Sequence, residues 1–164
     1  PAVGETRPVP KKLPNTTIEF RQDAYLDSGY IANQEQKMEI YRRLAAIEDE
    51  KTLTDLIDEV IDRFGTPSQP AEKLFRISEI RVKARHLGIG SIIDEGDSLL
   101  VTWADESFMH GWDPMKLPKT WLPQLKILPG SPAKLRIHKA LIKGTMTDWM
   151  ADFMDELKRE TGKQ

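Results

Sequence analysis

The chain has 164 residues, of which 39% are hydrophobic and 30% charged, and its formal net charge is −2. This length predicts one globular domain large enough to bury a core, and the near-neutral charge gives the whole chain no attraction to nucleic acid. There is no cysteine, which excludes disulfides and zinc sites with sulfur ligands. The sequence contains no signal peptide and no apolar run of bilayer length, so we expect a cytoplasmic protein without membrane contact.

Residues 1–16 are predicted to form an extended arm or linker, because this stretch is rich in proline and poor in apolar side chains. The prolines are Pro1, Pro8, Pro10 and Pro14. The chain begins at Pro1 rather than Met, from which we expect a piece of a longer protein. The folded domain is then expected over residues 17–164.

The first part of this domain is predicted to be a short strand followed by helices. Alternating polar and apolar residues predict a strand over 16–20, and helical periodicity predicts helices over 34–47 and 52–64. Thr52 is expected to cap the second of these helices and Gly65 to end it. The core face of this helix is predicted to contain six apolar residues: Leu53, Leu56, Ile57, Val60, Ile61 and Phe64.

A third helix is predicted over residues 70–87, where Ser68 and Pro70 open it and Gly88 closes it. Its core stripe is expected to consist of five residues: Leu74, Ile77, Ile80, Ala84 and Leu87. The same segment contains two acidic residues and five basic ones. The basic residues are Lys73, Arg76, Arg81, Lys83 and Arg85. These bases can contact phosphates, but they are spread around the helix, which favours a solvated surface or pairing with the neighbouring acidic helix.

The second part of the domain is predicted to supply most of the sheet. Two β-rich runs at 91–93 and 99–103, joined by a Glu-Gly-Asp turn, predict a hairpin. Alternation over 134–138 predicts a further strand at the sheet edge. Prolines interrupt the segment between them, where we expect only short helical pieces near Trp112 and Trp121.

A last helix is predicted to start at Thr145. Its apolar stripe resembles a groove-binding peptide, but a core face is the more common meaning of such a stripe. The stripe contains Met146, Trp149, Met150, Phe153, Met154 and Leu157. The order of elements predicts an α+β fold, a single domain in which helices pack around a small antiparallel sheet.

No residue pattern in the chain points to catalysis. Neither a Walker loop nor a dinucleotide-binding glycine loop is present, and the run at 130–134 lacks the required spacing, so we interpret it as a turn. The three histidines are scattered. Asp94, Asp97 and Asp105 flank the hairpin, and turn chemistry accounts for them better than a Mg²⁺ site does. We therefore predict a protein that is not an enzyme and has no cofactor and no metal.

The helix at 52–64 carries the sharpest functional pattern. Asp55, Asp58, Glu59 and Asp62 follow the spacing i, i+3, i+4 and i+7, which places them opposite the apolar stripe. Like charges at these spacings repel one another and destabilise an isolated helix. The acidic residues therefore form either an ordinary solvated face or a ridge that binds arginine side chains of a partner.

Four blocks of sequence resemble the C-terminal domain of the transcription-repair coupling factor. They are Ile-Ala-Asn-Gln at 31–34, Tyr-Arg-Arg-Leu-Ala at 41–45, Val-Ile-Asp-Arg-Phe-Gly at 60–65 and Arg-His-Leu-Gly-Ile at 85–89. Lys-Leu-Arg at 134–136 and the last helix also match in order and spacing. The resemblance extends over about residues 17–160 and is loose over 94–130.

This resemblance implies a regulatory domain of an ATP-driven translocase that removes stalled RNA polymerase from damaged DNA and recruits repair proteins. In that family the domain folds back on the UvrB-like N-terminal module of the same polypeptide and masks the surface that binds UvrA. The acids of the family's contact surface fall at Glu59 and Asp62, while Asp55 and Asp58 extend the ridge without a matched role. The ATPase motifs of the parent are absent from this sequence, and residues 1–16 would connect the domain to the motor. The alternative is a nucleic-acid-binding module that uses the basic helix at 70–87.

Overall fold

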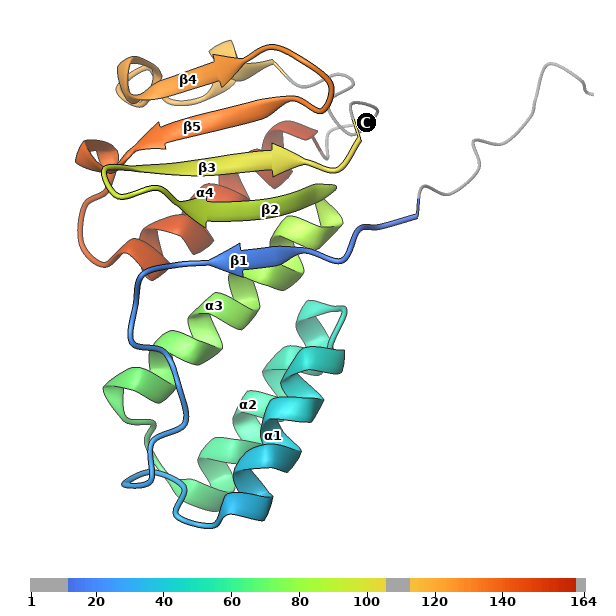
Figure 1. The fold of residues 1–164 in the computed structure, drawn as a ribbon, viewed down its shortest axis with the longest axis vertical. Helices are drawn as coiled ribbons and strands as arrows, with labels where there is room; N and C mark the ends of the chain where they lie inside the picture. The colour runs from blue at the N-terminus through green and yellow to red at the C-terminus, as the bar shows by residue number, and fades with distance from the viewer. Residues whose placement is uncertain (1–11, 106–112, 162–164) are drawn as a thin grey trace, which may run out of the picture.

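The computed structural model describes residues 12–105 and 113–161, which form a five-stranded sheet covered on one face by helices (Figure 1). The larger elements in chain order are β1 (Thr17–Glu19), α1 (Gln34–Ala46), α2 (Glu50–Phe64), α3 (Gln69–His86), β2 (Ile89–Asp94), β3 (Ser98–Trp103), β4 (Leu125–Leu128), β5 (Lys134–His138) and α4 (Met146–Thr161). Short 3₁₀ helices lie at η3 (Pro114–Lys116), η4 (Leu122–Gln124) and η5 (Lys139–Leu141). The predicted α+β fold is confirmed.

The strands are arranged in the order β1-β2-β3-β5-β4. Every neighbouring pair is antiparallel except β1 and β2, which run parallel, so the sheet is mixed. Helices α1, α2 and α3 separate β1 from β2 in the chain. A connection of this length returns the chain to the end of the sheet where β1 began, which a tight hairpin cannot do.

The position of the last strands differs from the sequence-based expectation. Strand β5 is not at the sheet edge, because it pairs with β3 on one side and with β4 on the other. Strand β4 was not predicted at all. It is only four residues long, and its Leu-Lys-Ile-Leu sequence lies within the proline-rich segment. An inner strand with one solvated face shows the same alternation as an edge strand, so the sequence of β5 does not distinguish the two positions.

Two hydrophobic cores share helix α3. The first lies between the sheet, α3 and α4, and includes Ile80 and Ala84 of α3. The second lies between α1, α2 and the other side of α3, where Phe75 and Val82 are buried. The predicted core stripe of α3 is therefore only partly right: its Ile80 and Ala84 are buried, whereas Leu74, Ile77 and Leu87 are half-buried. A helix packed on two sides needs two apolar faces, and a single stripe describes only one of them.

Helix α4 packs against the first core along its predicted apolar face. Met150, Phe153, Met154 and Leu157 are buried, and the rings of Trp149 and Phe153 stack with their centroids 5.1 Å apart. The stripe is thus part of the core. The predictions for residues 1–11 and for Trp112 lie outside the described residues. Among the helices of the described ranges, none is long and apolar enough to cross a membrane.

Candidate partner-binding surface on helix α2

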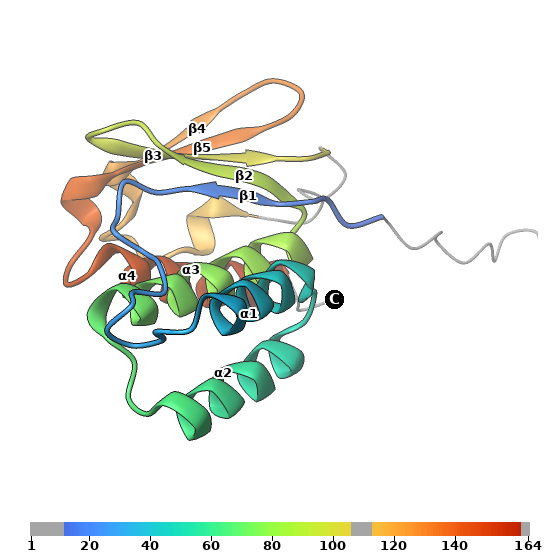
Figure 2. The same ribbon diagram turned by 60° about the horizontal axis from the view of Figure 1, so that its bottom comes forward.

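Helix α2 lies on the side of the helical layer that faces away from the sheet (Figure 2). Leu53, Leu56 and Val60 are buried in the second core and hold the helix against its neighbours α1 and α3. The opposite face of α2 has no packing partner in the part of the chain that the structure describes. The fold therefore presents the acidic residues of this helix to solvent.

The start of α2 is fixed by Asp49 rather than by Thr52. The Asp49 carboxylate accepts hydrogen bonds from the Thr52 amide and from the Thr52 hydroxyl, both at 2.8 Å. These bonds lower the pKa of Asp49, with the backbone bond as the largest cause. The expected cap at Thr52 was wrong, because the helix begins three residues earlier, where the Asp49 side chain accepts from the amide of Thr52 itself and leaves Thr52 inside the first turn.

The end of α2 is fixed at Gly65, as predicted. Gly65 has a φ of +85°, and its amide donates to the carbonyl of Ile61. Its own carbonyl accepts a hydrogen bond of 2.8 Å from the hydroxyl of Tyr30, whose ring contacts Phe64 edge-on. Hydrogen bonds thus hold both ends of the helix, and the acidic face has a fixed position in the domain.

The four acidic residues of the predicted ridge differ in what they contact. Asp55 pairs with Lys51 at 3.0 Å across one exposed helical turn. Asp58 and Asp62 are exposed, and neither forms an ion pair with another described residue. The structure thus leaves these two carboxylates to water.

Glu59 is bound by basic side chains of the domain itself. Its two carboxylate oxygens accept hydrogen bonds of 2.5 and 2.9 Å from the two terminal nitrogens of Arg43 on α1. Arg63 lies 3.5 Å from the same carboxylate. The bond from Arg43 is the largest cause of a lowered pKa at Glu59, and it raises the pKa of Arg43 in turn.

Ile61 belongs to this exposed surface and not to the core. Its residue is 39% exposed, although the periodicity predicted it to be a core residue. At about 100° per residue, Ile61 lies about 80° around the helix from Leu53. Because α2 packs only on the α1 and α3 side, the buried stripe is narrower than the apolar stripe. Ile57 and Phe64 are half-buried at its margins.

An acidic groove of about 460 Å³ runs between the end of α1 and the start of α2. Its charged lining consists of Glu48, Asp49, Asp55 and Glu59, with Arg43 as the one base. Glu48 and Asp49 belong to the loop between the two helices, and we did not predict them as part of the site. The run Glu-Asp-Glu at 48–50 is the sequence signal that could have drawn attention to them.

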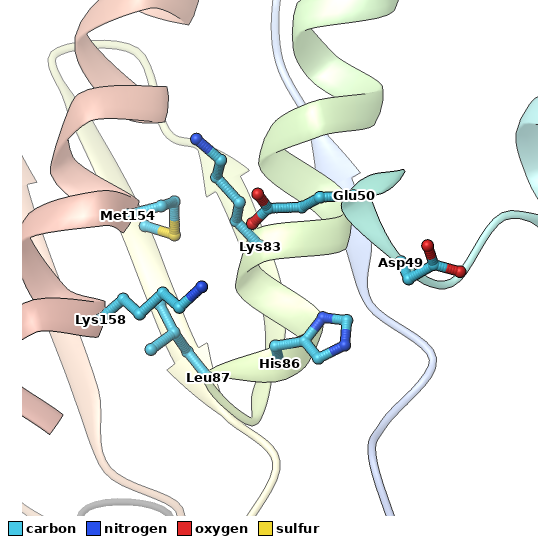
Figure 3. A pocket seen from close by; sticks show the side chains of 7 residues that line it. All are labelled: Asp49, Glu50, Lys83, His86, Leu87, Met154 and Lys158. Atoms are coloured by element: carbon cyan, nitrogen blue, oxygen red, sulfur yellow. The ribbon is translucent and has the colours of Figure 1, made fainter. Parts of the chain in front are cut away.

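A second cavity, of about 480 Å³, lies where the start of α2 meets the end of α3 and α4 (Figure 3). Its lining mixes acids and bases: Asp49, Glu50, Lys83, His86 and Lys158, together with Leu87 and Met154. The Lys83 amine lies 2.8 Å from both Glu79 and Asp155. The His86 ring nitrogen Nδ1 lies 2.9 Å from the carbonyl of Val82. Lys83 thus joins α3 to α4, while His86 is bound within α3.

Four of the five basic residues of α3 form ion pairs or hydrogen bonds within the domain. Arg76 pairs with Glu79 at 3.0 Å and with Asp148 of α4 at 3.1 Å. Arg81 donates to the carbonyls of Leu44 and Ile47, which supplies hydrogen-bond donors to the backbone at the C-terminal end of α1. Of the two expected alternatives, pairing with the acidic helix α2 was wrong, because the acids in reach belong to α3, to α4 and, at Glu48, to the loop before α2. Because these basic side chains are already engaged within the domain, the structure does not favour the alternative of a nucleic-acid-binding module.

The hairpin aspartates do not gather into a metal site in the described ranges, where no group of three potential ligands occurs. Asp94 is buried in the hairpin turn and accepts a 2.9 Å hydrogen bond from the amide of Gly96. It also accepts a 2.7 Å bond from the amine of Lys139. Burial alone would raise the pKa of Asp94, but these bonds outweigh it and lower the pKa.

Comparison with known proteins assigns the fold first and the family second. The chain superposes on a crystal structure of the C-terminal domain of transcription-repair coupling factor with a TM-score of 0.77 and 18% identity, covering 94% of this chain and 99% of that one. The class is therefore that of α+β domains built like this C-terminal domain. The family model of the TRCF domain matches residues 20–111, and the chain belongs to this family.

Sequence relatives agree with this assignment. The transcription-repair-coupling factor of Staphylococcus haemolyticus is 38% identical over 104 residues, which make up 62% of this chain and 9% of that protein. The factor of Staphylococcus epidermidis is 39% identical over 103 residues, or 61% of this chain and 9% of that protein. The chain thus spans about a tenth of the length of these relatives.

Proposed function

We propose that this chain is a non-catalytic regulatory domain of a transcription-repair coupling factor that acts by binding protein. It docks on the UvrB-like N-terminal module of the same polypeptide and masks the surface that binds UvrA. The parent protein then works in the cytoplasm in transcription-coupled DNA repair, as an ATP-driven translocase on DNA, with RNA polymerase and UvrA as partners. Membership of the TRCF domain family supports this proposal.

The observation that carries the proposal is the exposed acidic face of α2. Asp58 and Asp62 make no ion pair within the described residues, and like charges at this spacing destabilise a helix unless something offsets them. A basic partner provides that offset. The neighbouring groove adds Glu48 and Asp49 to the same acidic surface.

Glu59 and Asp62 have different parts in this contact. Asp62, which has no ion pair among the described residues, can accept an arginine of the partner in bidentate geometry, which fixes the orientation of the two side chains. Glu59 already binds Arg43 and Arg63, but a carboxylate has about four acceptor sites and can bridge a further base. We therefore assign the main contact to Asp62, with Glu59 as a shared site and with Asp55 and Asp58 extending the surface.

The contact is expected to be weak between separated parts and strong within one chain. Exposed ion pairs contribute about 0–1 kcal/mol each and weaken as salt is added. A linker within the same polypeptide raises the effective concentration to about the millimolar range. Such a contact holds the domain in place and still opens when a competing partner binds.

The test is a calorimetric titration of this domain against the UvrB-like module of its parent at low salt. The Asp58→Arg/Asp62→Arg variant should bind at least about tenfold more weakly, because it places repulsive charges in the contact. The matched control is Asp23→Arg/Asp152→Arg, which makes the same charge change at exposed residues outside α2 and should bind as the unmodified domain does. A Glu59→Arg/Asp62→Arg variant tests the family contact, with a thermal unfolding scan to exclude loss of fold.

Equal binding by the Asp58→Arg/Asp62→Arg variant and the control would show that this face of α2 takes no part in the contact. Absence of binding by the unmodified domain at sub-millimolar concentrations would overturn the proposed docking itself. Retention of the domain on DNA, lost steeply as salt rises, would instead support the nucleic-acid alternative.

A further inference from the structure

The face of the sheet that points away from α3 and α4 is uncovered by any segment that the structure describes (Figure 2). Alternate residues of the strands define its two faces. Leu135 and Ile137 of β5 are buried in the first core. Lys134 and Arg136, which alternate with them, therefore lie on the opposite, open face.

Strand register gathers basic side chains on one half of this open face. Arg136 of β5 is directly opposite Lys126 of β4, and Lys134 of β5 is opposite Leu128 of β4. Cross-strand partners share a face of the sheet, so the three bases lie together. Strands β3, β4 and β5 contain no acidic residue. We call this surface, with Lys126, Lys134 and Arg136 at its centre, the basic sheet face.

Apolar side chains lie beside these bases. Leu100 of β3 is the cross-strand partner of both Arg136 of β5 and Ile93 of β2. Ile93 and Leu100 are half-buried, and neither packs against either hydrophobic core. The basic sheet face therefore borders a small apolar strip that the folded domain does not use.

The bases of this face also form few ion pairs within the described residues. Among the described residues, Arg136 has one ion-pair partner, Glu95, at 3.4 Å, and both side chains are more than one-third exposed. Lys126 and Lys134 form no ion pair with other described residues. Four of the five bases of α3 differ from these, because acidic side chains or backbone carbonyls of the domain bind them. The positive charge on the sheet is thus available to an external anionic group.

We propose that the basic sheet face docks an acidic protein segment that carries apolar side chains between its carboxylates. Carboxylates would meet Lys126, Lys134 and Arg136, and apolar side chains would cover Ile93 and Leu100. Single-stranded nucleic acid fits less well, because binding it commonly requires aromatic rings for base stacking. The strand residues that form this face include no Phe, Tyr or Trp, since Trp103 of β3 is buried in the first core.

This docking surface goes beyond the proposed function of α2. Helix α2 and the open face of the sheet lie on opposite sides of the domain (Figure 2), and the two surfaces have opposite charge. One domain can therefore hold a basic partner through α2 and an acidic segment through the sheet at the same time. The proposal does not depend on whether α2 binds the UvrB-like module.

The test is an NMR titration of the isotope-labelled chain with a short synthetic peptide of alternating glutamate and leucine. A peptide of alternating lysine and leucine and a single-stranded oligothymidine serve as comparison probes. The acidic peptide should shift the amide signals of β3, β4 and β5, while the basic peptide should leave them unchanged. Binding should weaken with added salt, because the contact is between exposed charges.

Charge-reversed variants locate the binding surface. Lys126→Glu/Arg136→Glu should weaken binding of the acidic peptide at least about tenfold. Lys126→Gln/Lys134→Gln, which leaves the Arg136–Glu95 pair intact, should weaken it less and checks that loss of fold is not the cause. The control Arg42→Glu/Lys51→Glu makes the same charge change on exposed residues of α1 and α2 and should bind normally.

Three results would overturn the proposal. The first is the absence of any shift at millimolar peptide, and the second is a set of shifts confined to the helices. The third is oligothymidine binding on the sheet without binding of the acidic peptide, which would make the face a nucleic-acid surface. None of these results bears on the calorimetric test of α2, so the two proposals fail separately.

Discussion

Glu59 of α2 and Arg43 of α1 form a bidentate ion pair, in which the two terminal nitrogens of the arginine lie 2.5 and 2.9 Å from the two oxygens of the carboxylate. Both side chains are about 40% exposed. The pair joins two helices at the edge of the acidic groove. Glu59 therefore contributes to the internal structure of the domain as well as to the surface proposed to bind a partner.

Replacing Glu59 with glutamine is expected to make the stability of the domain less dependent on pH. The folded-state pKa of Glu59 lies below its ordinary value of 4.5. The contribution of the pair is thus fully present above about pH 4.5 and is lost as the pH falls through the lowered pKa. Urea unfolding of the variant should show a smaller difference between neutral and acidic pH than the unmodified domain shows.

The control for this prediction is Asp58→Asn, on the same helix but without an ion pair among the described residues. Its free energy of unfolding at neutral pH should stay within about 0.5 kcal/mol of that of the unmodified domain. Equal pH profiles for Glu59→Gln and the unmodified domain would show that the pair with Arg43 makes no net contribution in solution.

Replacing Asp94 with asparagine is expected to destabilise the domain by about 2–3 kcal/mol, because the Lys139 amine loses the charge that offsets its partial burial. The Asp94 side chain is 1% exposed and that of Lys139 is 29% exposed. Since the pKa of Asp94 is lowered in the fold, its contribution is present above the ordinary value near 3.8 and is lost as the pH falls through the lower folded value.

Urea unfolding at neutral pH measures this loss directly. Asp97→Asn is the matched control, because Asp97 lies in the same hairpin turn but is exposed, and it should change stability by less than about 0.5 kcal/mol. A similar loss for both variants would show that the turn, and not the buried pair, determines the effect.

Replacing Gly65 with alanine is expected to cost about 1–3 kcal/mol, because its φ of +85° and ψ of −166° are accessible almost only to glycine. Apart from the glycine itself and its two chain neighbours, no heavy atom lies within 4 Å of the position that a new Cβ would occupy. The cost is therefore backbone strain and not a steric clash. Thermal unfolding should show a lower midpoint for Gly65→Ala, while Thr66→Ala, an exposed neighbour, should unfold as the unmodified domain does.

Leu56 and Ile61 were both predicted to be core residues of the same helix, and their alanine variants should now differ. Leu56 is 3% exposed and Ile61 is 39% exposed. Leu56→Ala should destabilise the domain by about 2–5 kcal/mol and Ile61→Ala by less than about 1 kcal/mol. Chemical unfolding measures both values, and equal losses would mean that Ile61 is packed in solution.

The helices of the first half could be predicted closely from sequence because their signals are local. Helical spacing of apolar residues and the stop at Gly65 both operate within a few residues of the chain. The start of α2 was misplaced because Asp49 and Thr52 are both good caps, and the outcome depends on which of the two side chains accepts from the first free amides.

The sequence by itself determined that the domain has an α+β fold and that Asp55, Asp58, Glu59 and Asp62 lie opposite the buried face of one helix. Only the tertiary structure decided which of these acids are available. The approach of α1 places Arg43 against Glu59, while Asp58 and Asp62 have no such neighbour among the described residues. The basic sheet face has the same origin, because residues distant in the chain, such as Lys126 and Leu100, become neighbours of Arg136 only through strand pairing. Helical periodicity depends on residues a few positions apart, whereas ion pairs between helices and strand register depend on how distant segments pack.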